Sequence, residues 1–322
     1  MNKSLNYILA FFIVICSSLT LYAQEEKYQI GLIKKIYSMG TASVNGTYYP
    51  LGNAISRLLG KKLKNMVVIA EPTPGSIANV EYLRKKRIDL ALMQSDVAWI
   101  AHQGTFKDLK VLASLYSEKI QIVVRADSKI YKLEDLKGKK IAVGDRESGS
   151  AAGAIQILET AGLKNETDYE IVYERFTKST ASLFDGYVDA IYYVGAVPAD
   201  GLIRLSNRVP IRLIEIPPEI THKLTTAYPY FCNEKIGAEA YKGQTKEINT
   251  LGYKALLTCT SKLSAEEAFA MLDVIYSNPR ILSDQNEVLI EVNPREALIG
   301  VDTMMLHEGA AKYLANNMKT SK

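Results

Sequence analysis

The sequence predicts a two-lobed α/β protein with a ligand cleft between its lobes. The chain has 322 residues, which is more than one hydrophobic core usually organises, so its length favours two lobes. Short β-branched runs alternate with amphipathic helical stretches, and this alternation is typical of an α/β fold. Polar loops follow three of the predicted strands, at the edge where open α/β sheets bind their ligands.

The composition and charge are those of a globular protein, with 48% hydrophobic and 23% charged residues. A formal net charge of +4 is too small to indicate a nucleic-acid partner. The basic clusters Lys61-Lys62-Leu63-Lys64 and Arg84-Lys85-Lys86-Arg87 lie in amphipathic helical surroundings. We therefore interpret them as solvated helix faces and expect no nucleic acid to bind.

The N-terminus has the pattern of a signal peptide over residues 1–23. Lys3 supplies the positive charge, Tyr7 to Cys16 is apolar, and Leu21-Tyr22-Ala23 offers a cleavage site. The apolar run is shorter than the about 20 residues that span a bilayer, although a retained anchor helix is the alternative. Ile15 is bulky where lipoprotein signals carry a small residue, so lipidation at Cys16 is not expected. We expect a periplasmic or secreted protein after cleavage.

The first part of lobe 1 is predicted to cover residues 24–115. Its elements alternate in the order strand, polar loop, helix, strand, helix, strand. By apolar pattern and turn residues they lie at 28–33, 40–47, 49–63, 66–70, 77–86 and 89–94.

Lobe 2 is predicted over residues 116–226, and lobe 1 is completed by a return segment over 227–322. The runs 111–116 and 120–125 form one extended segment of the kind that passes between lobes. The strands that follow are expected at 141–144, 169–173, 188–194 and 209–216, with helices through Thr160 and over 179–186. The return segment is expected to end with helices over 264–277 and 294–318.

Three polar loops are the candidates for binding. They are Gly40 to Thr47, Gln94-Ser95-Asp96 and Ser148-Gly149-Ser150, each at the carboxyl end of a predicted strand and just before a helix. Small residues let the backbone approach a ligand, and the amides of a helix N-terminus favour an anion. Ordinary helix capping explains each loop taken alone. Arg146 either bonds a ligand carboxylate or pairs with Glu147 on the surface.

The mature chain retains two cysteines, Cys232 and Cys259, both in strand-like contexts. In an oxidising compartment they either pair or remain buried free thiols, and we favour a disulfide. The three histidines have no partner at ligand spacing, so no metal site is expected. Catalytic and phosphate-binding motifs are missing as well, so we predict a protein without enzyme activity or cofactor.

The ordered set of these motifs resembles the TAXI-type solute-binding proteins of tripartite ATP-independent periplasmic (TRAP) transporters, over nearly the whole mature chain. The matching segments are Gly40-Thr41, Gly46 to Gly52, Gly75 to Asn79, Asp89 to Asp96, Ala113 to Tyr116, Asp135 to Lys139, Val143-Gly144, Ser148 to Ser150, Val194 to Pro198, Tyr228 to Tyr230 and Leu306 to Ala310. The resemblance implies the class II periplasmic-binding-protein fold. It also implies capture of glutamate, glutamine, 2-oxoglutarate or a related carboxylate.

Carried over to this sequence, the resemblance implies a ligand shell drawn from four loops. Its members are Gly40, Thr41, Ser43 and Tyr48, then Gln94 and Ser95, then Ser148, Gly149 and Ser150, and finally Gly195. The ring of Tyr48 would close the site, and its hydroxyl would donate to the ligand. The implied partners are the integral-membrane TRAP permease subunits, and we expect a monomer.

The chain departs from the family pattern in two loops. Ala42, Val44 and Asn45 replace smaller residues or Thr, and Asp145 to Glu147 carry more charge than is typical. Both changes bear on ligand identity rather than on the fold. Two alternatives remain: a receptor for another transporter or a sensor kinase, and an enzyme on the same bilobal fold.

Overall fold

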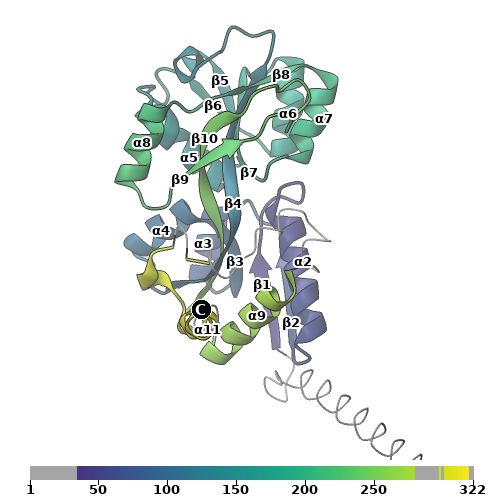
Figure 1. Ribbon diagram of the computed structural model, residues 1–322, viewed down its shortest axis with the longest axis vertical. Coiled ribbons are helices and arrows are strands. Elements are labelled where there is room, and N and C mark those ends of the chain that lie inside the picture. The colour runs from purple at the N-terminus through teal and green to yellow at the C-terminus, as the bar shows by residue number, and fades with distance from the viewer. Residues whose placement is uncertain (1–34, 280–296, 299–300, 319–322) are drawn as a thin grey trace, which may run out of the picture.

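The computed structural model of the protein describes residues 35–279, 297–298 and 301–318 (Figure 1). The predicted signal peptide and the strand predicted at 28–33 lie outside the described residues. Within them, two α/β lobes are stacked along the long axis of the molecule and joined by long strands (Figure 1). The predicted fold class is confirmed.

The lower lobe in Figure 1 is built on a sheet with the strand order β2-β1-β3-β10-β4. The neighbours β2, β1 and β3 run parallel, and β10 is antiparallel to both β3 and β4. Its elements are β1 (Lys35–Gly40), α2 (Tyr48–Lys62), β2 (Met66–Glu71), α3 (Ser76–Arg84), β3 (Leu90–Gln94), α4 (Ser95–Gln103), α9 (Ala265–Ser277), the 3-10 turn η4 (Thr303–Met305) and α11 (Glu308–Met318).

The upper lobe continues the same hydrogen-bonded path from β4 through β7 and β5 to β6. Strand β8 pairs with β4, and β9 pairs with β10. Its elements are η1 (Leu133–Leu136), β5 (Lys140–Gly144), α5 (Gly149–Thr160), β6 (Glu170–Tyr173), α6 (Phe176–Asp185), β7 (Ala190–Gly195), α7 (Asp200–Arg208), β8 (Ile211–Ile214), α8 (Pro218–Ala227) and β9 (Cys232–Ile236).

Two strands run through both lobes: β4 (Leu109–Arg125) and β10 (Ile248–Thr260). The first half of β4 pairs with β10, and from Lys119 onward β4 pairs with β7. The single extended segment predicted at 111–125 is therefore confirmed as one strand of 17 residues. Ser117 lies opposite Lys254, whose ammonium donates to the Ser117 hydroxyl at 2.7 Å, so a side-chain contact joins the two strands where they cross between lobes.

Side-chain alternation along the strands builds a core on each face of each sheet. In β3, Leu90 and Leu92 pack with α2 and α9, whereas Ala91 and Met93 pack with α3 and α4. In the upper lobe, β4 and β5 divide their side chains in the same way between the core beneath α5 and α8 and the core beneath α6 and α7. This period of two assigns successive side chains of a strand to the cores on opposite faces of the sheet.

The lobe boundaries remain a proposal. The hydrophobic cores favour a later position for the boundary at which the chain returns to lobe 1. Tyr230, Phe231, Leu251 and Tyr253 pack in the core of the upper lobe, whereas Ala255 and later residues pack in the lower one. We propose that the chain returns to lobe 1 within β10, near residue 254, rather than at 227.

The helix predicted over 294–318 is wrong in its extent. Residues 294–296 and 299–300 lie outside the described residues, and the helix α11 begins only at Glu308. Before it, the Asp302 side chain accepts a hydrogen bond from the amide of Met304 and caps the 3-10 turn η4. Leu306 then bridges to Val111 in β4, and this pairing keeps the chain extended.

The two cysteines do not form the disulfide that we favoured. Cys232 lies opposite Gly252 at one end of the β9–β10 pair, whereas Cys259 is paired with Leu90 and Lys110 near the other end of β10. Cys259 lies seven residues further along the strand than Gly252, which corresponds to about 23 Å at a rise of about 3.3 Å per residue. Both are free thiols.

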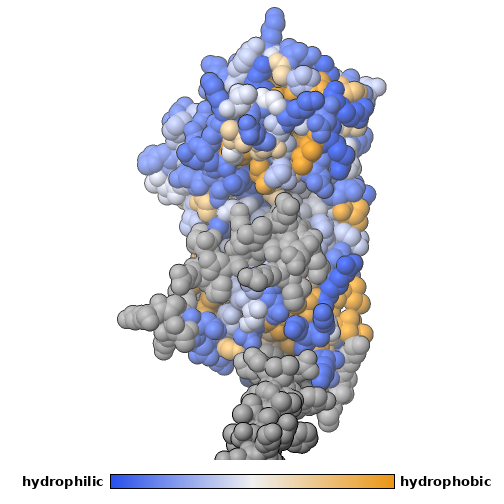
Figure 2. Space-filling view, turned by 45° about the vertical axis from the view of Figure 1, so that its right-hand side comes forward, coloured by the Kyte–Doolittle hydropathy of each residue, from blue (hydrophilic) through white to orange (hydrophobic). Residues whose placement is uncertain are grey.

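Apolar side chains on the face seen in Figure 2 occur in small groups among hydrophilic ones. The large hydrophobic residues with high exposure, such as Tyr187 and Met304, lie far apart in the chain. Through the described ranges, every helix is too short or too polar to cross a membrane.

Candidate functional site

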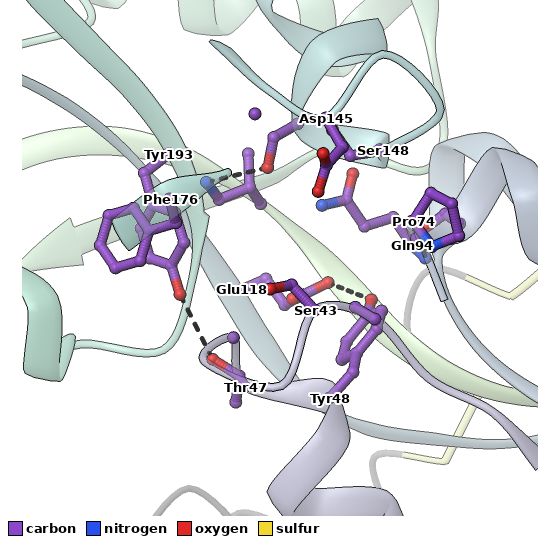
Figure 3. Close-up of a pocket in the computed structure, with 18 of the residues that line it drawn as sticks. Ser43, Thr47, Tyr48, Pro74, Gln94, Glu118, Asp145, Ser148, Phe176 and Tyr193 are labelled. Carbon is purple, nitrogen blue, oxygen red and sulfur yellow. Dashed lines mark hydrogen bonds between the residues drawn. The ribbon is translucent and has the colours of Figure 1, made fainter. Parts of the chain in front are cut away.

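A cavity of about 90 Å³ lies between the lobes and takes its walls from both (Figure 3). The lower lobe contributes the loop 42–48, the loop 74–76 and Gln94 at the end of β3. The upper lobe contributes the loop 144–150, α6 and residues 191–194 of β7, while Glu118 comes from the crossing segment of β4. The carboxyl ends of β1, β3, β5 and β7 thus lead to one site, as expected for open α/β sheets.

Four helices begin at residues that line this cavity. Helix α2 begins at Tyr48, α3 at Ser76, α5 at Gly149 and α6 at Phe176. The N-terminus of a helix carries a partial positive charge of about half an elementary charge and exposes backbone amides. The backbone therefore makes the cavity attractive to an anionic group, although no Lys, Arg or His is found among its described lining residues.

The lobes touch on either side of the cavity. The backbone carbonyl of Glu147 accepts hydrogen bonds from the amides of Ile77 and Ala78, at 3.1 and 3.3 Å, and so caps the N-terminus of α3 from the other lobe. On the opposite side, the hydroxyls of Thr47 and Tyr193 lie 3.5 Å apart (Figure 3). These contacts enclose the cavity, so the shape of the cavity depends on how the two lobes are positioned.

Two aromatic rings form the wall near Thr47. Phe176 and Tyr193 stack with their ring centroids 3.9 Å apart and an angle of 16° between the planes. Both rings lie at the left of Figure 3, with Thr47 below them. They give that side of the cavity a flat apolar surface.

The carboxyl group of Glu118 is the most unusual feature of the cavity. Its side chain is almost fully buried, with 3% of the residue exposed. The Tyr48 hydroxyl donates to Oε2 at 2.5 Å, and the Tyr116 hydroxyl donates to Oε1 at 3.2 Å (Figure 3 shows the first bond). Among the described residues, no Lys or Arg forms an ion pair with Glu118.

Burial raises the pKa of Glu118 to about 8, although the hydrogen bonds from Tyr48 and Tyr116 lower it and the nearby Asp96 charge raises it. Burial likewise raises the pKa of Asp96, at the start of α4, to about 7. The pKa of Asp145, which also lines the cavity, is raised by burial and lowered by Arg175. Acidic groups at the site therefore hold protons more readily than they would in water.

Gln94 brings an unsatisfied polar group to the cavity. The residue is 4% exposed, and its Oε1 has no hydrogen-bond partner among the described residues. The side chain lies against Gly149, where an added Cβ would collide with the Gln94 amide group. A buried amide oxygen without a partner costs about 1–3 kcal/mol, so the site is incomplete without a water or a ligand.

Six of the residues in the predicted ligand shell line the cavity: Ser43, Tyr48, Gln94, Ser148, Gly149 and Ser150. The structure thus brings three of the predicted loops together. Within them, Ser148 accepts from the Ala151 amide at the start of α5, and Ser150 accepts from the Val194 amide. These two hydroxyls therefore have structural partners in addition to any role in binding.

The other four predicted residues lie away from the cavity walls. Gly40 packs against Asn79 and Ile88, and Thr41 is fully buried and donates to the Glu71 carbonyl. Ser95 bridges the Tyr230 carbonyl and the Lys254 amide. Gly195 follows the lining segment of β7 and packs against the Tyr193 ring. These positions hold the loops in place, and a direct role in binding stays a prediction.

Two predicted interactions differ in the structure. The Tyr48 hydroxyl, expected to donate to a ligand, donates to Glu118. The guanidinium of Arg146 lies 3.9 Å from the centre of the Tyr173 ring and does not line the cavity. The exposed guanidinium stacks on an aromatic ring in place of either expected partner.

The predicted ligand shell left out Thr47 and Asp145, although both lie in loops that the sequence singled out, and sequence reasoning missed Glu118, Phe176 and Tyr193 altogether. Glu118 had a signal, because a lone carboxylate interrupts the long apolar strand between Leu109 and Arg125. Phe176 and Tyr193 had none, since aromatic residues at a helix start and in a strand are ordinary core residues. Over the described ranges, no cluster of His, Cys, Asp and Glu could hold a metal ion.

Solved structures of transporter binding proteins share this fold. A putative sulfonate ABC transporter's periplasmic sulfonate-binding protein from Methylobacillus flagellatus is 15% identical, with 90% of this chain and 97% of that chain covered and a TM-score of 0.51. A putative L-cystine ABC transporter protein from Listeria monocytogenes is 12% identical, with 80% and 96% covered and a TM-score of 0.53. An ancestral arginine-binding protein bound to arginine is 16% identical, with 79% and 97% covered and a TM-score of 0.51.

At such low identity the likeness concerns the fold alone, which is that of the bilobal solute-binding proteins. The sequence itself carries a family relationship over most of its length. The model of one family matches residues 39–316, from the end of β1 to the last turns of α11, and so includes every loop that lines the cavity. The chain belongs to the NMT1-like family.

Proposed function

We propose that the protein is an extracytoplasmic solute-binding protein, which captures a small carboxylate between its lobes and delivers it to a membrane transporter. The observation that carries the proposal is the cavity itself. It lies between two lobes, at the N-termini of four helices, and holds the unsatisfied amide oxygen of Gln94. The shared fold of the sulfonate-, cystine- and arginine-binding neighbours supports it.

The chemistry of the walls fits a small molecule with at least one anionic group. Helix N-termini and the side chains of Ser43, Gln94 and Ser148 offer donors to a carboxylate. A cavity of about 90 Å³ accommodates several water-sized groups, because one water needs about 10–15 Å³. Among such molecules, the resemblance to TAXI-type proteins makes glutamate, glutamine and 2-oxoglutarate the first candidates.

Hinge closure would trap the ligand. The Glu147 carbonyl and the Tyr193 hydroxyl reach across to the lower lobe beside the cavity. A ligand that touches both lobes stabilises the arrangement in which these contacts form, and so shifts the population of lobe positions toward closure.

The transporter has two candidates. The resemblance to TAXI-type proteins implies a TRAP permease, whereas two of the fold neighbours serve ABC transporters. These neighbours, together with the broader family to which the chain belongs, favour a receptor for another transporter over the TRAP assignment. A neighbouring gene for a large multispanning permease would support TRAP, and a neighbouring gene for an ATPase subunit would support the ABC type.

The test is calorimetry and thermal melting of the purified protein with glutamate, glutamine and 2-oxoglutarate. A ligand at about 100 times its dissociation constant adds about 2.7 kcal/mol to the stability. We expect Gln94→Leu to weaken binding by at least about tenfold without lowering the stability of the ligand-free protein, because it removes an unsatisfied buried amide.

Gln156→Leu is the matched control, since Gln156 donates to the Tyr230 hydroxyl at 2.9 Å and lies outside the cavity. It should lower the stability and leave the affinity unchanged. Equal loss of affinity in both variants would contradict the assignment of the cavity. If the wild-type protein binds none of the three carboxylates, the proposed ligand class is refuted.

A further inference from the structure

The charged side chains of the cavity have the wrong sign for a pure anion receptor. The described lining residues include two carboxylates, Glu118 and Asp145, and no cationic side chain. Arg175 approaches Asp145, with its Nε 3.9 Å from Oδ1, and lies largely in solvent. Among the described residues, no such cation pairs with Glu118: the groups that face it are the hydroxyls of Tyr48 and Tyr116 and, at longer range, the carboxyl of Asp96 and the hydroxyl of Tyr193.

The hydrogen bonds of Glu118 leave acceptor capacity free. An ionised carboxylate has about four lone-pair sites, and each oxygen of Glu118 receives one tyrosine hydroxyl. A buried carboxylate without a counter-charge is costly, and a ligand that brings a positive charge would remove this cost. In Figure 3 the Glu118 carboxyl lies on one side of the cavity, with Gln94 and Ser148 above it.

This arrangement offers separate places for opposite charges. The starts of α3 and α5, with Gln94 and Ser148, suit a carboxylate, whereas Glu118 suits an ammonium group. A dianion without an ammonium group would place its negative charge near Glu118 and Asp145. Such a ligand gains nothing from either carboxylate.

We propose that Glu118 is the specificity-determining residue of the cavity: its carboxylate binds the ammonium group of the ligand, so that the protein takes amino acids in preference to 2-oxo acids of the same size. This inference rests on the proposed function and narrows its ligand class.

Ligand binding should also change the protonation of Glu118. Since burial raises the pKa of Glu118 to about 8, most molecules carry a proton on Glu118 at pH 7. An ammonium group at hydrogen-bond distance favours the ionised form and lowers this pKa. Binding of an amino acid at pH 7 should therefore release up to about one proton to the buffer.

The experiment uses protein purified from cells that express the full chain. Calorimetry is carried out with the amino acids, and the best binder is compared with its 2-oxo and deamino analogues, for example L-glutamate with 2-oxoglutarate and glutarate. We expect a preference for the amino acid of at least about 100-fold. Buffers with different ionisation enthalpies report the released proton.

The variants are Glu118→Gln and, as a matched control, Glu234→Gln. Glu234 is a partly buried carboxylate in β9 that pairs with Lys119 and lies outside the cavity. Glu118→Gln should reduce the preference to below about tenfold and abolish proton release, while Glu234→Gln should retain both. Circular dichroism melting tests whether each variant is folded. If Glu118→Gln is unfolded, the preference of the wild type for the amino acid over its 2-oxo analogue decides.

Two results would overturn the inference. If the wild type binds 2-oxoglutarate as tightly as glutamate, Glu118 does not recognise ammonium, and the proposed solute-binding function stands. If no amino acid and no other carboxylate binds, both the inference and the proposed ligand class fail.

Discussion

Glu118 has both a structural and a chemical role at the site. It lies in the segment of β4 that crosses between the lobes, it borders the cavity, and it is buried against Tyr48 and Tyr116. The same desolvation that raises its pKa also makes the carboxyl respond to a charged neighbour. A solvated carboxylate at this place would respond far less.

The raised pKa predicts a pH dependence of stability in the ligand-free protein. The pKa of Glu118 rises from about 4.3 in the unfolded chain to about 8 in the fold, so between these values the folded state binds more protons. Its contribution is fully present below the unfolded value and is lost as the pH rises through the folded value. The free energy of unfolding should therefore fall between pH 5 and pH 8, by up to about 1.4 kcal/mol per pH unit from this group.

Urea denaturation of the wild type and of Glu118→Gln at pH 5, 6, 7 and 8 checks this prediction. Asp96, whose pKa is raised to about 7 by burial, adds to the slope in both proteins. His102 and His307, whose pKa values are lowered by burial, oppose it in both. The difference between the two curves isolates Glu118, and parallel curves would show that its carboxyl titrates normally.

At the scale of elements, local capping decides where helices start. Helix α9 begins after Ser264, whose hydroxyl accepts from the Glu267 amide while the Glu267 carboxylate accepts from the Ser264 amide. Glu267 also accepts from Lys35 at 2.6 Å and from Tyr37 at 2.7 Å, both in β1. The capping box therefore ties the return segment of the chain to the first described strand.

Loss of this cap should weaken the fold and leave the site intact. Ser264→Ala is expected to lower the free energy of unfolding by about 0.5–2 kcal/mol, because the first amides of α9 lose their acceptor. Thr226→Ala, at an exposed position of α8, is the control and should change stability by less than about 0.5 kcal/mol. Chemical denaturation measures both. An altered ligand affinity in Ser264→Ala would contradict the separation of this cap from the cavity.

Sequence patterns predicted the elements that obey local rules. Ser264 and Glu267 mark a helix start, and the apolar runs at 111–116 and 120–125 mark β4. The polar loops at Gln94 and at Ser148 to Ser150 were found because strand ends converge at one edge. Of strand β10 the sequence indicated only the strand-like context of Cys259, since Gly252 and Lys254 interrupt the apolar pattern where the strand passes between the lobes.

The failures concern contacts between distant segments. The Tyr48 hydroxyl donates its hydrogen bond to Glu118, 70 residues away in the chain, and Arg146 stacks on Tyr173. Neither pairing can be recognised from the spacing of residues in the sequence. The same is true of the stacked Phe176 and Tyr193, which look like core residues until the lobes are placed together.

At the scale of the whole molecule, two strands connect the lobes, two polar contacts close them beside the cavity, and Ser95 and Trp99 of α4 contact Tyr230 of the upper lobe. Strands β4 and β10 run through both cores without a break, so lobe motion must be absorbed near Ser117 to Lys119 and Gly252 to Lys254. The closing contacts involve the Glu147 carbonyl and the Tyr193 hydroxyl. A few contacts of this kind are easily made and broken, which suits a protein that must release its ligand.

Gly75 provides a test of closure, because it lies where the lobes meet. Its φ of 135° is rarely adopted by residues with a side chain, and an added Cβ would lie 3.1 Å from Ser148 Cα in the other lobe. Ordinary carbon–carbon contacts lie at about 3.5–4.0 Å, so Gly75→Ala should hold the lobes apart. At a cost of about 1–3 kcal/mol to the closed arrangement, ligand affinity should fall by about 5- to 150-fold. Small-angle scattering should show a smaller ligand-induced compaction than in the wild type.

Gly138→Ala is the control, since Gly138 also has a positive φ, of 75°, but nothing lies within 4 Å of an added Cβ. Gly138→Ala should lower the stability of the protein, while ligand binding and compaction persist. If Gly75→Ala keeps the affinity of the wild type, the protein binds its ligand without closing at this contact.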